Sequence, residues 1–364
     1  MQDKPQASPK MPLLLAIESS CDDTSVALMQ DGGLLALKTG GQEEHARYGG
    51  VVPEIASRAH QAWLAGLVQG VMTEHQIPWT SIDAVAYTRG PGLLGSLMVG
   101  ASLAKGLALA LNKPLLGVNH LHAHLVSPGI ENRQAMVFPA LILTVSGGHT
   151  HLVRMDSWLD WEVLAETRDD AAGEAFDKCA KMLGLGYPGG PALDRLAQSG
   201  NPQAHRWPKT QLGLDSYSFS GIKTSLLYFL QKNKITLINE AGSALADLCA
   251  SLQSTLVEML LGPMKAHVQV QRPASLALAG GVACNSQLRR ECLALGEALG
   301  LPVFIPAPAY CTDNAAMVAF AATHLWEAGA TSRDALTERP LARWPLHLYA
   351  EELLALNPGS WGKS

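Results

Sequence analysis

Two segments of the chain share one pattern: an apolar strand, a short polar turn and a second apolar strand. In the first segment, LLLAIES (residues 13–19) and SVALMQ (25–30) flank a turn that contains CDDT; in the second, ALILTVSGGHTHLVRM (140–155) has SGGH at its centre. Apolar runs of this length, bounded by turn residues, predict two β-hairpins. Because the whole pattern recurs, it predicts two related lobes that face a cleft.

Further elements follow the hairpins in a similar order. After the first hairpin, the apolar periodicity predicts a strand at 34–38, a helix at 55–73, a strand at 82–88, a helix at 95–111 and a strand at 114–118. After the second, it predicts a strand at 161–167, a helix at 173–183 and a buried strand at 275–280. The expected fold class is therefore α/β, with a duplicated βββαβα core.

The chain is long enough for two domains, each with its own apolar core, because it has 364 residues. We expect the linker between them near 129–139. The predicted organisation is a flexible tail at 1–11, an N-terminal lobe at 12–130 that is completed by about 310–350, a second lobe at 131–309 with a helical insertion at about 190–270, and a C-terminal tail at 351–364.

The charge balance limits the kind of nucleic-acid binding that the chain can support. Lys and Arg number 27 and Asp and Glu number 32, which gives a formal net charge of -5. A protein this acidic does not hold nucleic acid by bulk electrostatics, so any RNA binding requires a local patch or a partner.

Cysteine usage and hydropathy predict a cytoplasmic protein. The six cysteines are scattered without a CxxC pair, and no signal peptide precedes them, so we expect reduced thiols and no disulfides. We find no apolar run of the roughly 18 to 20 residues that cross a bilayer, and we therefore expect no membrane association.

Histidines in NHLHAHL are the first candidate metal ligands. His120 and His124 are four residues apart and would project from one face of a helix, whereas His122 would point to the other side. The segment lacks the glutamate of HExxH, so it is not a zinc protease signature. Asp313, after the strand-like PVFIP, is a candidate third ligand, with helix N-cap as its alternative role. His149 and His151, which share one face of a strand, form a lower-ranked alternative pair.

Glycine-rich turns supply the candidate substrate contacts. The SGG turn of VSGGHT would expose backbone N–H groups to a phosphate or acyl group, although such a turn is also common in ordinary hairpins. In DDAAGEAFDK, Asp170 is predicted to be the N-cap of a helix, and Asp177 would be either a solvent-facing carboxylate or a ligand of a ribose. In AGGVACN, Asn285 would begin a helix at a position suited to an adenylate.

Small residues recur every fourth position along the helix expected at 95–111. They are Ser96, Gly100, Ala104 and Ala108. A face of this kind lets a neighbouring backbone approach closely. Packing on the helix's own sheet is one interpretation, and docking of a partner helix is the other.

Taken together, these motifs resemble those of the TsaD family, in the superfamily of actin, sugar kinases and chaperone ATPases. Between about residues 13 and 346 the chain contains, in family order, ESSCDDTSVAL, YGGVVPEIASRAH, AYTRGPGLLGSLMVG, VSGGHT, DDAAGEAFDK, YPGGP, SYSFSGIKT, AGGVACN, CTDNAAM and RWPL. The resemblance implies two actin-like lobes, with the ligand and a metal in the cleft between them. It implies one divalent metal per subunit, Fe(II) or Zn(II), held by His120, His124 and Asp313. The substrate positions that it implies are Thr144, Val145, Ser146, Gly147, Gly148, Asp177, Gly190 and Asn285.

The resemblance also implies an activity and partners. The implied reaction transfers threonylcarbamoyl from L-threonylcarbamoyladenylate to N6 of the adenosine 3′ of the anticodon in ANN-decoding tRNAs, and releases AMP. The implied partners are a TsaB-like paralogue, for which the small-residue helix face is a docking candidate, and a TsaE-like ATPase. We expect Asp22, at the tip of the first hairpin, to be the general base.

Several residues depart from the family pattern or lie outside it. Asp23 stands where bacterial members often have Glu, and Arg89 stands where they often have Ala, which makes Arg89 a candidate phosphate or RNA contact. Other basic candidates for RNA binding are His205, Arg206 and Lys209 around Trp207, and Arg289 with Arg290.

Three other functions stay open at this point. A sugar or acetate kinase of the same superfamily would phosphorylate a small molecule with ATP and would not need paired histidines. A metalloprotease would use the histidines, but the glutamate is absent from the motif. A nucleotide-binding regulator would bind nucleotide without turnover.

Overall fold

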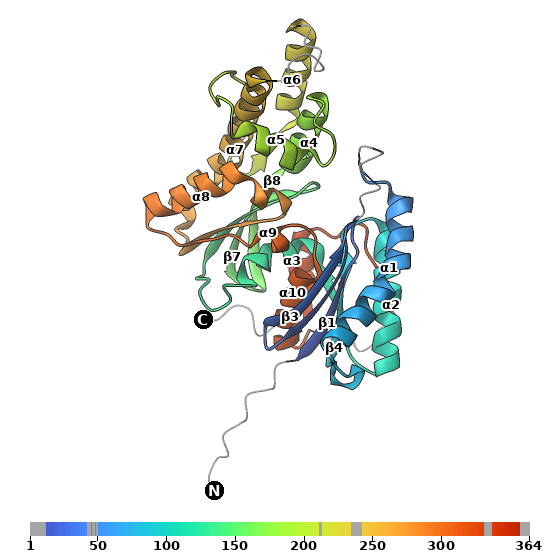
Figure 1. Ribbon diagram of the computed structural model, residues 1–364. Helices are drawn as coiled ribbons and strands as arrows, with labels where there is room; N and C mark the ends of the chain where they lie inside the picture. The colour runs from blue at the N-terminus through green and yellow to red at the C-terminus, as the bar shows by residue number, and fades with distance from the viewer. Residues whose placement is uncertain are drawn as a thin grey trace.

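The chain forms two lobes, each built on one β-sheet (Figure 1). The computed structural model describes residues 12–41, 45, 48, 50–210, 213–233, 242–330 and 337–356. The predicted tail at 1–11 lies outside these residues.

The sheet of the first lobe has the strand order β3-β2-β1-β4-β5. Its strands are β1 (Leu13–Glu18), β2 (Thr24–Gln30), β3 (Gly33–Gly40), β4 (Ala84–Gly90) and β5 (Leu115–Asn119). β1 pairs antiparallel with β2 and parallel with β4, and β5 pairs parallel with β4. The carboxyl ends of β1, β4 and β5 therefore lie along one edge of the sheet.

Helices cover both faces of this sheet. They are α1 (Pro53–Glu74) and α2 (Leu94–Leu111) on one face and α10 (Ala315–Glu327) on the other. Along β1, Leu15 and Ile17 pack in the cluster that includes α1 and α2, whereas Leu14 and Ala16 pack in the cluster that includes α10. Because successive side chains of a strand point to opposite faces, a continuous apolar run is what a sheet covered on both sides requires.

The sheet of the second lobe has the strand order β11-β10-β6-β7-β8-β9. Its strands are β6 (Ala140–Val145), β7 (Thr150–Ser157), β8 (Asp160–Thr167), β9 (Ser216–Tyr217), β10 (Ser275–Ala279) and β11 (Val303–Phe304). β6 pairs antiparallel with β7 and parallel with β10. Except for the added edge strand β9, this arrangement repeats that of the first sheet, so the predicted duplication and the actin-like α/β class are confirmed.

The remaining helices lie mostly in the second lobe and at the junction of the lobes. They are α3 (His120–Val126), α4 (Ala172–Met182), α5 (Gly189–Ala197), α6 (Ser220–Asn233), α7 (Ser243–Gln271), α8 (Ser286–Leu299), α9 (Pro308–Cys311) and α11 (Leu346–Leu356). Short 3₁₀ turns at Trp79–Ser81, Ser127–Gly129 and Gly281–Cys284 complete the order. The domain boundaries themselves stay predictions.

The C-terminal tail predicted from residue 351 needs correction. Residues 351–356 belong to α11, in which Tyr349 and Leu353 are buried. Tyr349 packs edge-on against Trp344, with ring centroids 4.7 Å apart, and this contact holds the helix to the rest of the chain. Residues 357–364 lie outside the described part of the chain.

The small-residue face of α2 packs on the helix's own sheet. Ser96, Gly100, Ala104 and Ala108 are all buried. A Cβ atom added at Gly100 would lie 2.2 Å from Oγ of Ser19, so the strand end requires glycine there. The packing interpretation is therefore confirmed, and partner docking on this face is wrong because the face is already covered.

Two helices, α2 and α7, are long and apolar enough to cross a membrane by length and composition alone. The expectation that no segment reaches this length is therefore wrong. Of the apolar window, 67% is buried in α7, as in a helix that packs in a protein core. In α2 33% is buried, because this helix packs on the core along one face.

Candidate metal and substrate site

The short helix α3 presents two histidines at the junction of the lobes. It begins directly after β5, and the Asn119 side chain caps it by accepting hydrogen bonds from the N–H groups of Leu121 and His122. His120 and His124 are buried, and their rings lie 4.7 Å apart at an interplanar angle of 82°. The predicted projection from one side of a helix is confirmed.

Asp313 completes a group of three possible metal ligands. Its Oδ1 lies 3.0 Å from Nε2 of His124 and 3.5 Å from Nε2 of His120. The alternative role as helix N-cap is wrong, because Asn314 caps α10 by accepting from the N–H of Met317 at 3.0 Å. The carboxylate of Asp313 therefore does not cap the helix, and it contacts the two histidines instead.

The spacing of these three groups fits a metal ion. Their ligand atoms all lie within 4.8 Å of one another, and no other such group of three occurs among the described residues. A tetrahedral zinc site with bonds of about 2.0–2.1 Å places neighbouring ligand atoms roughly 3.3 Å apart, close to the two distances to Asp313. Two imidazoles and one carboxylate also leave open positions on Zn(II) or Fe(II), as a catalytic metal requires.

A buried glutamate lies behind the first histidine. Oε2 of Glu18 is 3.2 Å from Nδ1 of His120, and the carboxylate also accepts from the N–H of Ser20 and the hydroxyl of Thr88. Our reading of the sequence missed this residue. The signal was present, because an acid inside a fully apolar strand is rare unless it has a partner.

The charges of this cluster hold one another in the ionised state. Burial alone would lower the pKa of His120, but the carboxylates of Asp313 and Glu18 raise it to about 9. Burial would likewise raise the pKa of Asp313, and the neighbouring charge of His120 and the hydrogen bond of His124 lower it instead. Without a metal, His120 is therefore protonated, and its positive charge lies between the two carboxylates.

His122 and the His149–His151 pair lie outside the group of three. Nε2 of His122 is 2.8 Å from the carbonyl oxygen of Trp158, so this ring points away from the metal ligands as predicted. The rings of His149 and His151 stack at 5.7 Å with an interplanar angle of 19°. In the described part of the chain they do not form a group of three possible ligands, as His120, His124 and Asp313 do, although Nε2 of His151 is 3.9 Å from Oε2 of Glu166. The pair stays a lower-ranked alternative.

The glycine turn at the tip of the second hairpin is open to a ligand. The N–H of Ser146 donates to the carbonyl oxygen of His149 at 2.8 Å, which closes the turn. Gly147 and Gly148 are exposed, and an added Cβ at either would meet nothing within 4 Å. Their amides make no hydrogen bond to the described residues, so they can donate to an anion.

Other predicted substrate residues have structural partners of their own. Oδ1 of Asp177 accepts from the N–H groups of Gly189 and Gly190, each at 2.9 Å. Asn285 caps α8, and its amide donates to Gln253 at 2.8 Å. Thr144 and Val145 are buried at the end of β6, beside the turn.

Asp170 does not cap α4, which corrects a further prediction. The N-cap of α4 is Ala171, which has no side chain that could cap it. The Asp170 carboxylate accepts instead from Lys223 at 2.7 Å and from Lys178 at 3.0 Å. These two ion pairs tie α4 to α6.

The tip of the first hairpin carries Asp22 and Asp23, both half-buried. Burial and the negative charges of Asp313, Asp22 and Glu18 together raise the pKa of Asp23 to about 7. Asp23, which stands where family members often have Glu, is therefore close enough to the metal ligand Asp313 for the charge of that carboxylate to raise its pKa.

Most of the predicted basic contacts have partners within the chain. The guanidinium of Arg89 lies 4.8 Å above the ring of Trp344 and donates to the carbonyl oxygen of Arg339, so Arg89 is not free to bind phosphate. Trp207 is buried and donates to Ser251, and Lys209 pairs with Glu258. Arg289 donates to the carbonyl oxygens of Ala283 and Pro306. Arg206 and Arg290 are exposed, whereas His205 is half-buried.

Comparison with known proteins shows the family to which the chain belongs. The family model described as "TsaD: tRNA N6-adenosine threonylcarbamoyltransferase" matches residues 33–320. The chain belongs to the TsaD family. It is 47% identical over 311 residues to the tRNA N6-adenosine threonylcarbamoyltransferase of Cytophaga hutchinsonii, which covers 85% of this chain and 90% of that one. It is 48% identical over 323 residues to the protein of the same name from Porphyromonas gingivalis, which covers 84% of this chain and 91% of that one.

Solved structures support the fold of this TsaD-family chain at low sequence identity. HypF of T. kodakarensis superposes with a TM-score of 0.60 and 15% identity, over 92% of this chain and 50% of that one. At this identity the likeness concerns only the fold, which is the two-lobed architecture described above.

Proposed function

We propose that the protein transfers the threonylcarbamoyl group of L-threonylcarbamoyladenylate to N6 of the adenosine 3′ of the anticodon in ANN-decoding tRNAs, with release of AMP. The observation that carries the proposal is the convergence of His120, His124 and Asp313, within 4.8 Å of one another, in a chain of the TsaD family. A kinase of the same fold would not need this ligand set.

The metal ligands have a defined part in this proposal. His120, His124 and Asp313 would hold one Fe(II) or Zn(II), and that ion would supply Lewis-acid polarisation and an anchor for the donor. Glu18 accepts a hydrogen bond from Nδ1 of His120, which directs Nε2 of the same ring towards Asp313.

The glycine turn and the helix starts around it would bind the donor. The free amides of Gly147 and Gly148 can donate to phosphate or carbamoyl oxygens, so the charge of the departing AMP is stabilised. Asp177, Gly190 and Asn285 would contact the adenosine part of the donor, together with Thr144, Val145 and Ser146. Holding donor and acceptor in one geometry also removes the entropy cost of their encounter.

A proton must leave the attacking nitrogen, because N6 of adenine is a weak nucleophile whose lone pair is delocalised into the ring. We assign this task to Asp22, at the tip of the first hairpin. Asp23 is the rival, since its raised pKa of about 7 suits a base that works near neutral pH. Full transfer by an Asp22→Asn variant with donor and tRNA saturating would exclude Asp22.

The proposal includes partners and a compartment. A TsaB-like paralogue and a TsaE-like ATPase would act with this chain, a separate enzyme would make the adenylate, and the location would be the cytoplasm. The docking surface for the paralogue is not the small-residue face of α2, which is buried within the chain.

The test of the activity is direct. The purified protein is incubated with synthetic threonylcarbamoyladenylate and an ANN-decoding tRNA, with and without partners and with and without a chelator. The modified nucleoside is then sought by mass spectrometry. We expect it in the complete reaction and its loss with chelator; its absence from every reaction, partners included, would refute the proposal.

Variants test the metal ligands separately. His120→Ala and Asp313→Ala should lose bound metal, measured by elemental analysis, together with transfer. His75→Ala is the matched control, because His75 is an exposed histidine at the end of α1. Normal metal content in both ligand variants would remove this site from the proposal.

A further inference from the structure

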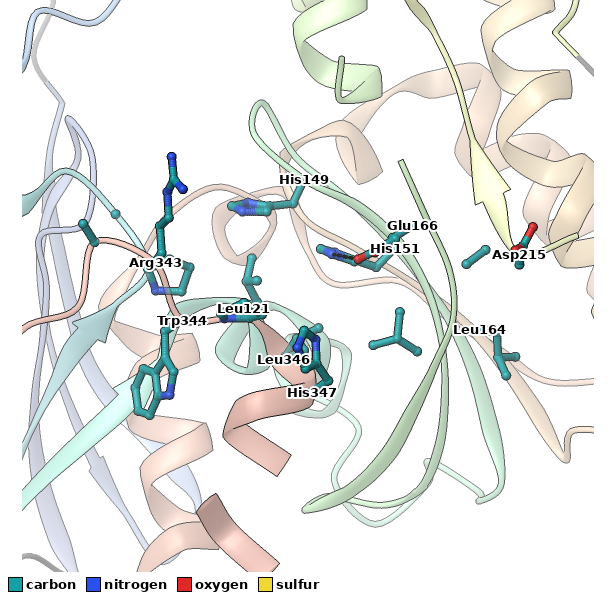
Figure 2. Close-up of a pocket in the computed structure, with 16 residues that line it drawn as sticks. Leu121, His149, His151, Leu164, Glu166, Asp215, Arg343, Trp344, Leu346 and His347 are labelled. Carbon is teal, nitrogen blue, oxygen red and sulfur yellow. Dashed lines mark ion pairs between the residues drawn. The ribbon is translucent and has the colours of Figure 1, made fainter. Parts of the chain in front are cut away.

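A cavity of about 680 Å³ lies between the lobes and is lined by residues that the donor site does not use. One wall is formed by β7 and β8, with His151 and Glu166, and the other by residues 342–347, with Arg343 and His347. Figure 2 shows Arg343 across the open space from His149 and His151. Volumes of about 300–1,000 Å³ are typical of sites for small ligands, so the cavity can hold a group the size of a nucleotide.

The cavity borders the metal ligands. Leu121, which lines it, directly follows the metal ligand His120 in α3. His149, which also lines it, directly follows the glycine turn and senses the charges of His120 and His124. Asp177, Gly190 and Asn285 do not line it. Donor residues and cavity are therefore different regions that meet at His149 and α3.

The strand wall offers flat, uncharged rings. Burial lowers the pKa of His149 to about 3 and that of His151 to about 4, so both imidazoles are neutral at physiological pH. Their planes are 19° apart, and Val163 and Ala165 line the same wall. Neutral aromatic rings beside aliphatic groups are the surface on which single-stranded RNA binding sites stack an unpaired base.

The opposite wall offers unpaired cationic and polar groups on a fixed backbone. The N–H of Leu341 donates to the carbonyl oxygen of Arg89 at 2.7 Å, and Asn119 donates to the carbonyl oxygen of Trp344 at 2.9 Å. Arg343 and His347 are exposed, and the described residues contain no ion-pair partner for either. An arginine held in this way can bind a phosphate with two parallel hydrogen bonds.

The acidic groups of the cavity are Glu166 of β8 and Asp215, which precedes β9. Asp215 pairs with Arg168 at 3.4 Å, and Oε2 of Glu166 lies 3.9 Å from Nε2 of His151. The charge is therefore divided, with the unpaired cation on the 342–347 wall. A free polyanion would be repelled at one end, whereas a single nucleotide can place its phosphate at Arg343 and its base amines towards the acids.

We propose that this cavity receives the acceptor, a purine nucleotide of a single-stranded RNA loop turned out of its stack, with its base against His149 and His151 and its phosphate at Arg343. The inference rests on the proposed function, and it adds where the RNA enters. Enzymes that act on a base must take it out of the stack, and a cavity that opens beside the metal ligands meets this need.

Kinetics test the proposal with two cavity variants. At saturating donor, His151→Ala and Arg343→Ala should each raise KM for tRNA about 5- to 150-fold, which corresponds to the roughly 1–3 kcal/mol of a stacking or charged contact. KM for the donor and the metal content should not change. His151→Phe keeps a flat ring and should restore KM to within about 3-fold of the wild type, which a merely structural role of His151 does not require.

The controls distinguish failure of the proposed function from failure of the acceptor cavity. Arg58→Ala removes an exposed arginine of α1 that lies outside the cavity, and it should leave KM for tRNA unchanged. If the wild type makes no modified nucleoside, the proposed function fails. If the wild type is active and both cavity variants keep a normal KM for tRNA, only the acceptor cavity fails.

Crosslinking gives a readout that is independent of turnover. An anticodon stem-loop that carries 8-azidoadenosine at the acceptor position is irradiated with the wild-type protein, and the labelled peptides are identified by mass spectrometry. We expect label within residues 149–166 or 342–347. Label confined to other peptides, such as those with Arg206 or Arg290, would overturn the proposal.

Discussion

Glu18 and His120 form a buried pair in which the carboxylate accepts at Nδ1 and the opposite ring nitrogen faces Asp313. The two distances are 3.2 Å from Oε2 of Glu18 and 3.5 Å to Oδ1 of Asp313. A histidine that binds a metal is commonly oriented by such a second carboxylate, which fixes the tautomer and increases the basicity of the ligand nitrogen. The first hairpin therefore contributes to the site through the end of β1.

Glu18→Gln tests this orienting role. The amide keeps the shape of the side chain but removes the charge, so metal affinity should fall about 10- to 100-fold, with a parallel loss of transfer at limiting metal. Metal affinity is measured by competition with a chelator of known affinity. Glu54→Gln, at an exposed carboxylate of α1, should leave both quantities unchanged. Wild-type affinity in Glu18→Gln would show that the hydrogen bond is structural only.

His151 makes the stability of the protein depend on pH below neutrality. Its pKa is lowered to about 4 in the folded state by burial, against about 6.5 in the unfolded chain. Between about pH 4 and pH 6.5 the unfolded state binds more protons at His151 than the folded state does. The free energy of unfolding is therefore not reduced by His151 above about pH 6.5, and it decreases as the pH falls towards 4. The loss is at most about 3 kcal/mol.

His151→Phe should reduce this dependence, because phenylalanine cannot take up the proton. The free energy of unfolding is measured by urea titration at pH 7 and pH 4.5, with chelator present throughout. We expect a smaller difference between the two pH values for His151→Phe than for the wild type. His75→Phe, at an exposed histidine, should keep the wild-type difference, and equal differences in all three proteins would contradict the burial argument.

The fold was predictable where local pattern determines it. Both hairpins were expected within a few residues of the observed strands β1, β2, β6 and β7, because continuous apolar runs between turn residues allow few alternatives. β11 lies within the run PVFIP, which is already strand-like in the sequence, whereas β9 could not be predicted in the same way. β9 has two residues, too few for periodicity, and it is defined by pairing with β8, which is distant in sequence.

The candidate site was predictable only in part. The four-residue spacing of His120 and His124 indicates a shared side of a helix, but the sequence could not tell which of Asp313 and Asn314 caps α10. That choice depends on the backbone of the preceding loop, in which Asn314 is extended with φ of −156°. The acceptor cavity was invisible to sequence reasoning, since its two walls are separated by about half of the chain.

Gly280 should be intolerant of any side chain. Its φ is +82°, and an added Cβ would lie 2.4 Å from the carbonyl oxygen of Val145, a backbone atom that cannot rotate away. Strain and overpacking together predict that Gly280→Ala loses on the order of 3 kcal/mol or more, and that donor binding weakens because Val145 precedes the glycine turn. Thermal unfolding measures the loss.

Gly300→Ala is the matched control for that prediction. Gly300 also has a positive φ, +67°, but an added Cβ would meet nothing within 4 Å. Only the backbone penalty of about 1–2 kcal/mol remains. Equal losses of stability in the two variants would show that the close contact with Val145 does not contribute to the destabilisation.

Variants of Asp177 distinguish a structural role of this side chain from a role in donor binding. In its structural role, Oδ1 of Asp177 accepts hydrogen bonds from the N–H groups of Gly189 and Gly190. Asp177→Ala leaves both donors without this partner, so it should lose about 1–3 kcal/mol of stability. Asp177→Asn keeps an acceptor oxygen, so it should unfold near the wild-type temperature.

The charge of Asp177 is the remaining difference between Asp177→Asn and the wild type. A hydrogen bond between a carboxylate and a ribose hydroxyl contributes about 1.5–3 kcal/mol, which corresponds to a rise of roughly 10- to 100-fold in KM for the donor when the charge is removed. The rise is measured at saturating tRNA, where the acceptor cavity does not limit the rate. A normal KM in a fully stable Asp177→Asn protein would assign Asp177 to the support of the turn alone.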